Sequence, residues 1–173
     1  AWTATIKFLI VRETRRIFSR LVDAHINYLE EARSLHASYG VAANRVFITA
    51  NSPDTDEIFR HEASLQHVTS NPYRLLHVGR LVKWKQVDLL IEATVELRKK
   101  YVSTELTIVG DGPEMERLRA QVMEAGAQDY IQFTGGVYDM WELGRITCEA
   151  GIYVLAGMGG LSINEAMCFG KSI

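Results

Sequence analysis

The chain has 173 residues, of which 47% are hydrophobic and 23% are charged, and its formal net charge is -2. This length suits one domain, or one domain with part of a second, and the apolar fraction suffices for a core. The charge balance argues against a general nucleic-acid-binding protein, because such proteins carry a basic surplus. No apolar run approaches the ~20 residues of a membrane span and no signal peptide is evident, so we expect a cytoplasmic protein.

The first 50 residues predict helices and a strand. Residues 1–20 mix apolar and basic side chains, which is typical of a helix with a solvated basic face. A second helical pattern follows and stops at Gly40, and residues 45–50 alternate like a strand. The first residue is not Met and Ile173 stands where a strand is expected to begin. Both ends therefore look like cuts through a longer protein.

Residues 51–72 predict a linker. The segment opens with residues that favour turns, in the order Asn, Ser, Pro and Asp, and then becomes polar and irregular. After residue 72 the character of the sequence changes to a regular alternation. We therefore expect a first part over residues 1–50, a linker over residues 51–72, and a domain over residues 73–173.

The last hundred residues alternate between strand and helix patterns. Helical spacing of apolar residues follows each expected strand, and Asp139 is placed to cap one of these helices. Strands joined by crossover helices run parallel, with helices on both faces of the sheet. The fold class is therefore α/β, a doubly wound parallel sheet whose ligands bind at the carboxyl ends of its strands. The expected strands are residues 73–79, 104–110, 130–136 and 151–156.

Glycines stand at the carboxyl end of every expected strand or directly after it. A turn that contains glycine lets backbone N–H groups come close to an anion, because glycine has no Cβ and tolerates positive φ. Any one of these glycines could serve turn geometry alone. Together they predict a pocket lined by backbone that suits a flat base and a pyrophosphate. They are Gly79, Gly110, Gly135, Gly136, Gly157, Gly159 and Gly160.

Three charged residues lie beside these turns. Arg80 and Lys85 follow the first strand, where a diphosphate needs positive partners; Arg can bind phosphate in a bidentate manner and Lys supplies a compact charge. The alternative is a pair of solvated loop cations. Glu165 lies near a helix start, where it can accept two ribose hydroxyls or simply interact with the helix dipole.

The candidate metal ligands form no familiar motif. Asp54-Thr55-Asp56 has the D-x-D spacing of metal-dependent glycosyltransferases of the GT-A fold, but it lies in the expected linker. His61 and His67 match no metal spacing, and Cys148 and Cys168 lie in helical patterns without C-x-x-C. We predict no metal site and two reduced cysteines that serve packing.

Four ordered motifs in the second half of the chain resemble the carboxy-terminal, donor-binding domain of the retaining family 4 glycosyltransferases of GT-B architecture. The segment VFITANSPDTDEIF is similar to the family's linker between acceptor-binding and donor-binding domains. The resemblance runs from about residue 21 to the end. It implies a Rossmann-like domain that is incomplete at its carboxyl end, preceded by the tail of an acceptor-binding domain. The four motifs are GRLVKWKQVDLLIEA, LTIVGDGPEMERL, IQFTGGV and GLSINEAMCFGKSI.

The resemblance also assigns roles to residues. It implies that Arg80 and Lys85 bind the donor diphosphate and neutralise its charge during catalysis, and that Glu165 contacts the ribose. The family has two glutamates separated by seven residues, and Gly157 occupies the position of the first one here. The residues implied to hold the base are Gly135, Gly136 and Val137, and those implied to face the phosphates and sugar are Gly157, Met158, Gly159, Gly160 and Leu161.

The implied reaction moves a sugar from a nucleoside-diphosphate sugar to an acceptor hydroxyl with retention. The acceptor is a glycan, a lipid or a small molecule, no cofactor is needed besides the donor substrate, and nucleic acid is not a partner. Peripheral membrane contact through the amino-terminal domain is left open, and the fragment alone is expected to be inactive. A nucleotide-sugar epimerase and a non-catalytic nucleotide-binding module remain alternatives. A Rossmann dehydrogenase would need G-x-G-x-x-G after the first strand, where Gly79-Arg80-Leu81-Val82 stands.

Overall fold

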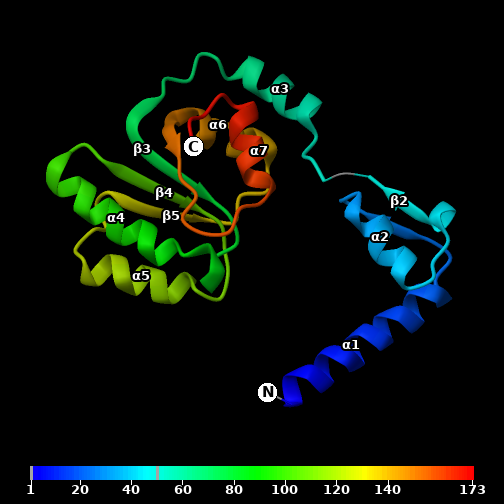
Figure 1. The fold of residues 1–173 in the computed structure, drawn as a ribbon. Coiled ribbons are helices and arrows are strands. Elements are labelled where there is room, and N and C mark those ends of the chain that lie inside the picture. Colours follow the sequence, from blue (N-terminus) through cyan, green and yellow to red (C-terminus); the bar gives the residue numbers. More distant parts are fainter. Residues whose placement is uncertain (1, 50) are drawn as a thin grey trace. The chain divides into compact units, whose positions relative to one another are not determined.

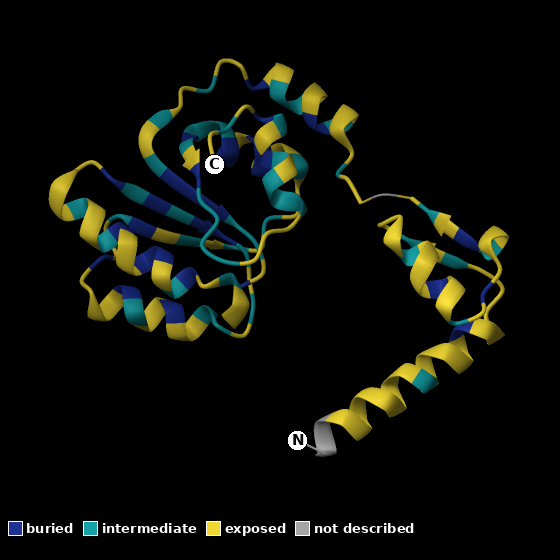
Figure 2. Ribbon diagram, in the orientation of Figure 1, coloured by how far each residue is buried: buried dark blue, intermediate teal, exposed yellow. Residues whose placement is uncertain are grey.

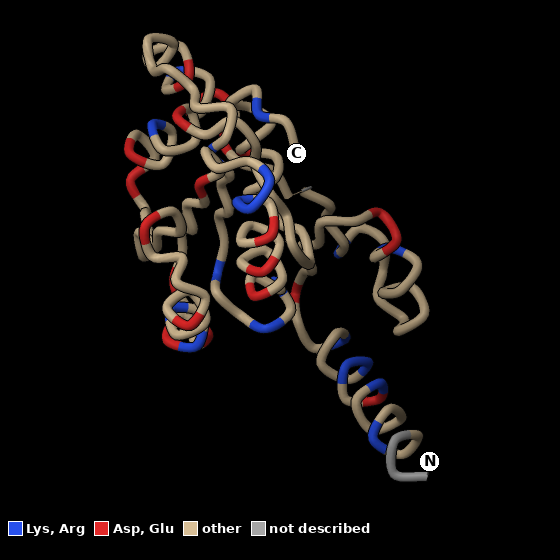
Figure 3. Tube along the Cα trace, turned by 90° about the vertical axis from the view of Figure 1, so that its left-hand side faces the viewer, with Lys and Arg blue, Asp and Glu red and all other residues tan. Residues whose placement is uncertain are grey.

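The computed structural model describes residues 2–49 and 51–173. The chain divides into two compact units, Ala1–Asn51 and Ser52–Ile173. The first unit contains a parallel pair of short strands. Its first helix carries the expected basic residues (Figure 3), and their side chains are exposed. Apolar side chains of this helix, such as Phe8 and Ile10, are exposed as well (Figure 2). Its elements are α1 (Trp2–Leu21), β1 (His25–Asn27), α2 (Glu31–Ser38), η1 (Ala43–Arg45) and β2 (Val46–Ile48).

The second unit is built on a four-stranded sheet with the order β5-β4-β3-β6, in which all neighbours run parallel. The chain moves outward from β3 to β4 and β5 and then returns to place β6 on the other side of β3. This reversal makes the carboxyl ends of β3 and β6 the switch point where ligands bind in such sheets. The expected parallel α/β fold is confirmed. The strands are β3 (Asn71–Val78), β4 (Glu105–Val109), β5 (Ile131–Gly135) and β6 (Ala150–Tyr153).

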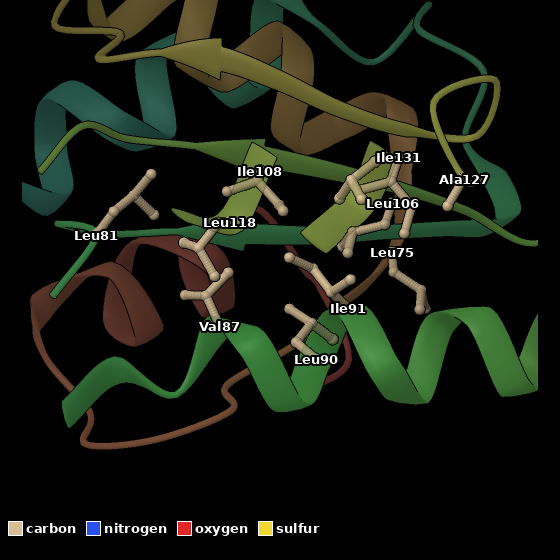
Figure 4. Packing of buried hydrophobic residues seen from close by; sticks show 11 residues of the cluster. Leu75, Leu81, Val87, Leu90, Ile91, Leu106, Ile108, Leu118, Ala127 and Ile131 are labelled. Atoms are coloured by element: carbon tan, nitrogen blue, oxygen red, sulfur yellow. The ribbon is translucent and has the colours of Figure 1, made fainter. Parts of the chain in front are cut away.

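Helices cover both faces of this sheet (Figure 1). On one face, Leu90 and Ile91 of α4 pack with Leu118 of α5 against the strands, as Figure 4 shows. On the other face, side chains of α6 and α7 pack against Leu76 and Tyr153. The helices are α4 (Val87–Lys100), α5 (Met115–Glu124), α6 (Met140–Glu149) and α7 (Leu161–Cys168), with a short η2 (Lys83–Lys85) before α4.

The helix boundaries follow the sequence signals closely. Asp139 caps α6, since its carboxylate accepts a hydrogen bond of 2.8 Å from the backbone N–H of Glu142. Gly126 follows α5 with φ +63°, the left-handed conformation that ends helices. No helix in the described part of the chain is long and apolar enough to cross a membrane.

The segment that we expected to be irregular contains a helix, α3 (Thr55–Ser64). Asp54 caps it through a 3.0 Å hydrogen bond from the N–H of Glu57. Ile58 is 1% exposed and packs in a cluster with Leu65 and Phe169. The expectation of irregular chain was wrong because so few apolar side chains anchor this helix that its polar surface dominates the sequence pattern. Asp54, the first aspartate of the D-x-D triplet, therefore serves as the N-cap of α3.

Truncation of Ile58 tests whether α3 belongs to the second unit. We expect Ile58→Ala to lower the free energy of unfolding by about 2–5 kcal/mol, because it removes a buried side chain from the contact of α3 with α6 and α7. The matched control is Phe59→Ala on the same helix, whose side chain is 52% exposed and whose loss should cost less than about 1 kcal/mol. Equal effects of the two substitutions in urea unfolding would contradict the packing of α3.

Candidate functional site

The carboxyl ends of β3, β4 and β5 line a cavity of about 490 Å³. This volume lies within the ~300–1,000 Å³ that is usual for small-molecule sites. Of the residues predicted from the sequence, the cavity gathers Gly79, Arg80, Gly110, Gly136 and Val137. Its lining residues are Val78, Gly79, Arg80, Val109, Gly110, Asp111, Gly112, Gly136, Val137 and Tyr138.

Two glycines in the turn after β4 permit a close backbone approach. A Cβ atom at Gly110 would lie 1.9 Å from the carbonyl oxygen of Gly79, and one at Gly112 would lie 2.3 Å from that of Leu81. Both glycines also have positive φ, +144° and +159°. The N–H of Leu81 donates to the Asp111 carbonyl at 2.9 Å. These glycines hold the loop after β3 in place while their backbone lines the cavity.

Gly135 has a supporting position outside the cavity lining. Its carbonyl accepts a 2.8 Å hydrogen bond from the N–H of Gly110, and its φ of +79° bends the chain at the end of β5. Gly136 and Val137 therefore reach the cavity, and the side chain of Val137 packs into the core cluster below.

Arg80 is an unpaired cation at the cavity. Its side chain is exposed, and its guanidinium makes no hydrogen bond or ion pair with the described residues. A guanidinium left free beside a cavity lined by backbone is ready to bind an anion in bidentate fashion.

Lys85 lies between the cavity and the glycine turn after β6. Its ammonium donates to the carbonyl oxygens of Met158 at 2.7 Å and Gly159 at 3.4 Å. Its Cε lies 3.9 Å from where a Cβ of Gly79 would stand, so its stem borders the cavity wall. Neither Lys85 nor the turn from Gly157 to Leu161 lines the cavity. The Lys85 side chain nevertheless connects this turn to the cavity wall.

The ammonium of Lys85 also stands next to the amino terminus of α7. It lies 3.5 Å from the Cβ position of Gly160, the residue that precedes the helix. Among the described residues no side chain caps this helix end. Uncapped N–H groups and the helix dipole favour an anion, and Lys85 adds a full positive charge at the same place.

Gly157 has no room for a side chain. A Cβ atom there would lie 2.4 Å from the carbonyl oxygen of Trp84 and 2.7 Å from the carbonyl carbon of Lys85. The next N–H, that of Met158, donates to the same Trp84 carbonyl at 3.2 Å. The glycine at the position of the expected acid is therefore required by this packing, and a glutamate at 157 would displace the turn.

Glu165 lies on the first turns of α7, partly buried. Burial raises the pKa of its carboxyl group. It is outside the cavity lining, but Tyr153 connects α7 to the cavity: the Tyr153 hydroxyl donates to the Val78 carbonyl at 3.0 Å and pairs with the Ser162 hydroxyl at 2.7 Å. The structure thus places Glu165 outside the cavity lining, on the helix whose Ser162 is linked to Val78 through Tyr153.

His77 is a residue of the site that the sequence reasoning missed. Its ring is fully buried on β3, and Nδ1 lies 3.0 Å from the Val154 carbonyl, which makes Nδ1 the donor. Nε2 has no partner in the described chain and lies 3.5 Å from the Cβ position of Gly79. Burial lowers the pKa of His77; the hydrogen bond to Val154 partly opposes this, and the charge of Lys85 adds a smaller lowering. A single histidine in an apolar strand gave no signal of this placement.

Across residues 2–49 and 51–173, no group of histidine, cysteine, aspartate and glutamate side chains is arranged to hold a metal ion. Cys148 and Cys168 are unpaired, and both pack beside the cluster that holds α3. Burial raises the pKa of the Cys148 thiol, which keeps it protonated.

Residues 59–173 match the sequence model of the family described as glycosyl transferases group 1. The chain belongs to this family. Its fold agrees, since the pneumococcal O-GlcNAc transferase GtfA, solved with UDP and GlcNAc, superimposes with a TM-score of 0.66 at 24% identity, over 91% of this chain and 31% of that one. The GT-B fold expected from the sequence is thereby confirmed.

Two curated relatives match part of this glycosyltransferase chain. The UDP-N-acetylglucosamine–peptide N-acetylglucosaminyltransferase GtfA subunit of Streptococcus gordonii is 34% identical over 99 residues, 56% of this chain and 19% of that protein. A GDP-mannose-dependent alpha-(1-6)-phosphatidylinositol monomannoside mannosyltransferase of Mycobacterium tuberculosis is 35% identical over 112 residues, 61% of this chain and 29% of that protein. The chain thus spans less than a third of either relative.

The packing of Gly157 predicts a specific cost for a side chain. We expect Gly157→Ala to lower the free energy of unfolding by about 1–3 kcal/mol, because its Cβ meets the backbone of Trp84 and Lys85 rather than a flexible side chain. In Gly160→Ala the added methyl meets only the Lys85 ammonium at 3.5 Å, so a change within about 0.5 kcal/mol is expected. Thermal or urea unfolding of both variants checks the difference, and equal stability would contradict the tight turn.

The buried His77 predicts a pH dependence of stability. Its pKa in the folded chain lies below the usual 6.5, so the unfolded chain binds the proton more readily and stability falls as the pH drops below about 6.5. His77→Gln should flatten part of this fall in urea unfolding between about pH 7.5 and 5.5. The control His67→Gln changes an exposed histidine and should keep the slope of the original protein. The same slope in all three proteins would refute the assignment.

Proposed function

We propose that this chain is the donor-binding part of a glycosyltransferase that moves a sugar from a nucleoside-diphosphate sugar to an acceptor hydroxyl with retention, without a resident metal or cofactor. The observation that carries the proposal is that two cationic side chains lie at the carboxyl edge of the sheet. Arg80 lies beside the cavity and Lys85 at the start of α7, and within the described residues Arg80 has no partner and α7 no side-chain cap. Such a site suits two adjacent phosphates.

The relatives support a nucleotide donor without fixing its base. One is named for UDP-N-acetylglucosamine and the other for GDP-mannose, and the pneumococcal enzyme was solved with UDP and GlcNAc. Within this chain, the turn of Gly135 to Val137 would take the base through backbone groups. Glu165 would accept the ribose hydroxyls, for which a carboxylate beside the switch point is suited.

In the proposed mechanism, the site catalyses the reaction by stabilising the negative charge on the leaving group. The bond between the anomeric carbon and the diphosphate oxygen breaks, and its electron pair stays with the diphosphate. Arg80, Lys85 and the amides at the start of α7 offset the negative charge that grows there, which lowers the barrier because they are already positioned. The acceptor oxygen bonds the same carbon from the face that the diphosphate leaves, and its proton passes to the departing diphosphate.

A second candidate is a nucleotide-binding module without turnover. One observation favours it: the backbone packing at Gly157 excludes an acid from the position where the resemblance expects one beside the donor sugar. Product analysis with the whole protein separates the two. Sugar transfer supports the enzyme, and tight nucleotide binding without any transferred sugar supports the module.

Removal of either cation tests the phosphate site. We expect Arg80→Ala and Lys85→Ala to weaken binding of a nucleoside diphosphate about 10- to 100-fold, as for hydrogen bonds to charged groups, and to leave binding of the nucleoside unchanged. Lys83→Ala removes an exposed cation from the same short helix as Lys85 and should alter neither affinity. Isothermal titration with UDP, GDP, uridine and guanosine measures this. Equal losses for nucleoside and diphosphate would overturn the assignment.

A further inference from the structure

Tyr153 carries a buried hydroxyl group at the end of β6. The residue is 1% exposed, and its ring packs in the core cluster with Leu76 of β3 and Ala166 of α7. A buried hydroxyl is costly unless it is hydrogen-bonded. Burial raises the pKa of the Tyr153 phenol and its hydrogen bonds oppose this only in part, so the hydroxyl keeps its proton at neutral pH. Tyr153 can therefore act as a hydrogen-bond donor inside the core.

This hydroxyl joins two elements of the site. Its oxygen lies 3.0 Å from the Val78 carbonyl oxygen at the end of β3 and 2.7 Å from the hydroxyl oxygen of Ser162 in α7. A phenol has one proton and a carbonyl can only accept, so Tyr153 donates to Val78 and Ser162 donates to Tyr153. Val78 lines the cavity, whereas Tyr153 and Ser162 do not. The two hydroxyls thus connect the cavity wall to the start of α7.

The first turn of α7 depends on this connection. The helix has only eight residues, Ser162 is the second of them, and Gly160 precedes it. So short a helix has little stability of its own, and glycine leaves the preceding backbone free to move. Among the described residues, the bond from Ser162 to Tyr153 is the one side-chain hydrogen bond of this turn. Ile163 and Ala166 hold the helix on the core, and the hydrogen bond adds a directional constraint at its start.

The position of this turn matters for an anion. In the phosphate site proposed above, the N–H groups at the start of α7 and the ammonium of Lys85 act on one diphosphate. This ammonium lies 3.5 Å from the Cβ position of Gly160, next to the helix start. Hydrogen bonds weaken steeply with distance and angle, so a small shift of the turn would weaken the phosphate contacts and leave the nucleoside contacts as they are.

We propose that Tyr153 and Ser162 are positioning residues of the phosphate site, because their hydrogen bond fixes the first turn of α7 against the end of β3. This inference rests on the function proposed above and gives a role to two side chains outside the cavity lining. A role in stability alone would not distinguish a nucleoside diphosphate from its nucleoside. The positioning role lowers affinity for the diphosphate only.

Isothermal titration with UDP, GDP, uridine and guanosine tests this role. We expect Tyr153→Phe and Ser162→Ala each to weaken binding of the diphosphates about 3- to 10-fold, the worth of one hydrogen bond, and to leave nucleoside binding unchanged. The double variant should bind like Tyr153→Phe alone, because that substitution already removes the partner of Ser162. Ser162→Thr keeps the hydroxyl and should bind like the original chain.

The matched control is Thr147→Val, which removes a buried hydrogen bond of 2.7 Å to the Leu143 carbonyl within α6 and should leave all affinities unchanged. Circular dichroism verifies that each variant is folded at the temperature of the titration. Ser162→Ala leaves the bond from Tyr153 to Val78 intact, so it decides the question if Tyr153→Phe does not fold.

Four results would overturn the positioning role while the proposed function stands. They are unchanged diphosphate binding by Ser162→Ala, an equal loss for the nucleosides, an equal loss in Thr147→Val, and losses that add in the double variant. If the original chain binds neither UDP nor GDP, the proposed function fails first and the positioning role with it.

Discussion

The site depends on one loop, Gly79 to Lys85, that is held between two other turns by backbone contacts too close for any side chain. The turn after β4 approaches it at Gly79 and Leu81, and the turn after β6 approaches it at Trp84. Hydrogen bonds reinforce both sides, from Leu81 to Asp111 and from Met158 to Trp84. Because this loop carries both cations of the site, Arg80 and Lys85, the close packing of the opposite glycines fixes the backbone positions of these two residues.

The same constraint explains the missing acid. A glutamate at position 157 would require the turn after β6 to withdraw from Trp84, and Lys85 would then lose its carbonyl partners at Met158 and Gly159. This chain therefore keeps its tightly held lysine, with a glycine at the position where the resemblance leads one to expect a carboxylate beside the sugar. The reaction proposed above would therefore rest on stabilisation of the leaving diphosphate and not on a negative charge near the anomeric carbon.

The sequence predicted much of the fold because the signals in the second half agree with each other. Apolar strands, helical spacing and caps such as Asp139 all repeat in one order, and parallel pairing follows from that order. The sequence did not predict α3, where the buried Ile58 stands in a mostly polar segment beside an exposed Phe59. Local patterns cannot report a helix whose stability comes from packing against elements about 80 to 110 residues later.

Within the site, the sequence located residues but not their partners. Arg80 lies at the cavity because it comes just after the end of β3. The sequence did not predict the contact of Lys85 with Met158, the burial of the His77 ring or the exposure of the Tyr138 ring. Each of these depends on how turns from distant strands meet at the sheet edge. Turn geometry of this kind is set by tertiary contacts and leaves no periodic signal.

One strained residue shows how firmly the loop is fixed. Gln86 follows Lys85 with φ +51°, a left-handed conformation that disfavours a residue with a Cβ. Strain of this kind costs of order 1–3 kcal/mol and persists only when neighbouring structure determines it. On one side Lys85 is bound to the turn after β6, and on the other Val87 is buried as α4 begins. The chain must turn at Gln86 to satisfy both, so core packing stabilises the backbone that aims Lys85 at the start of α7.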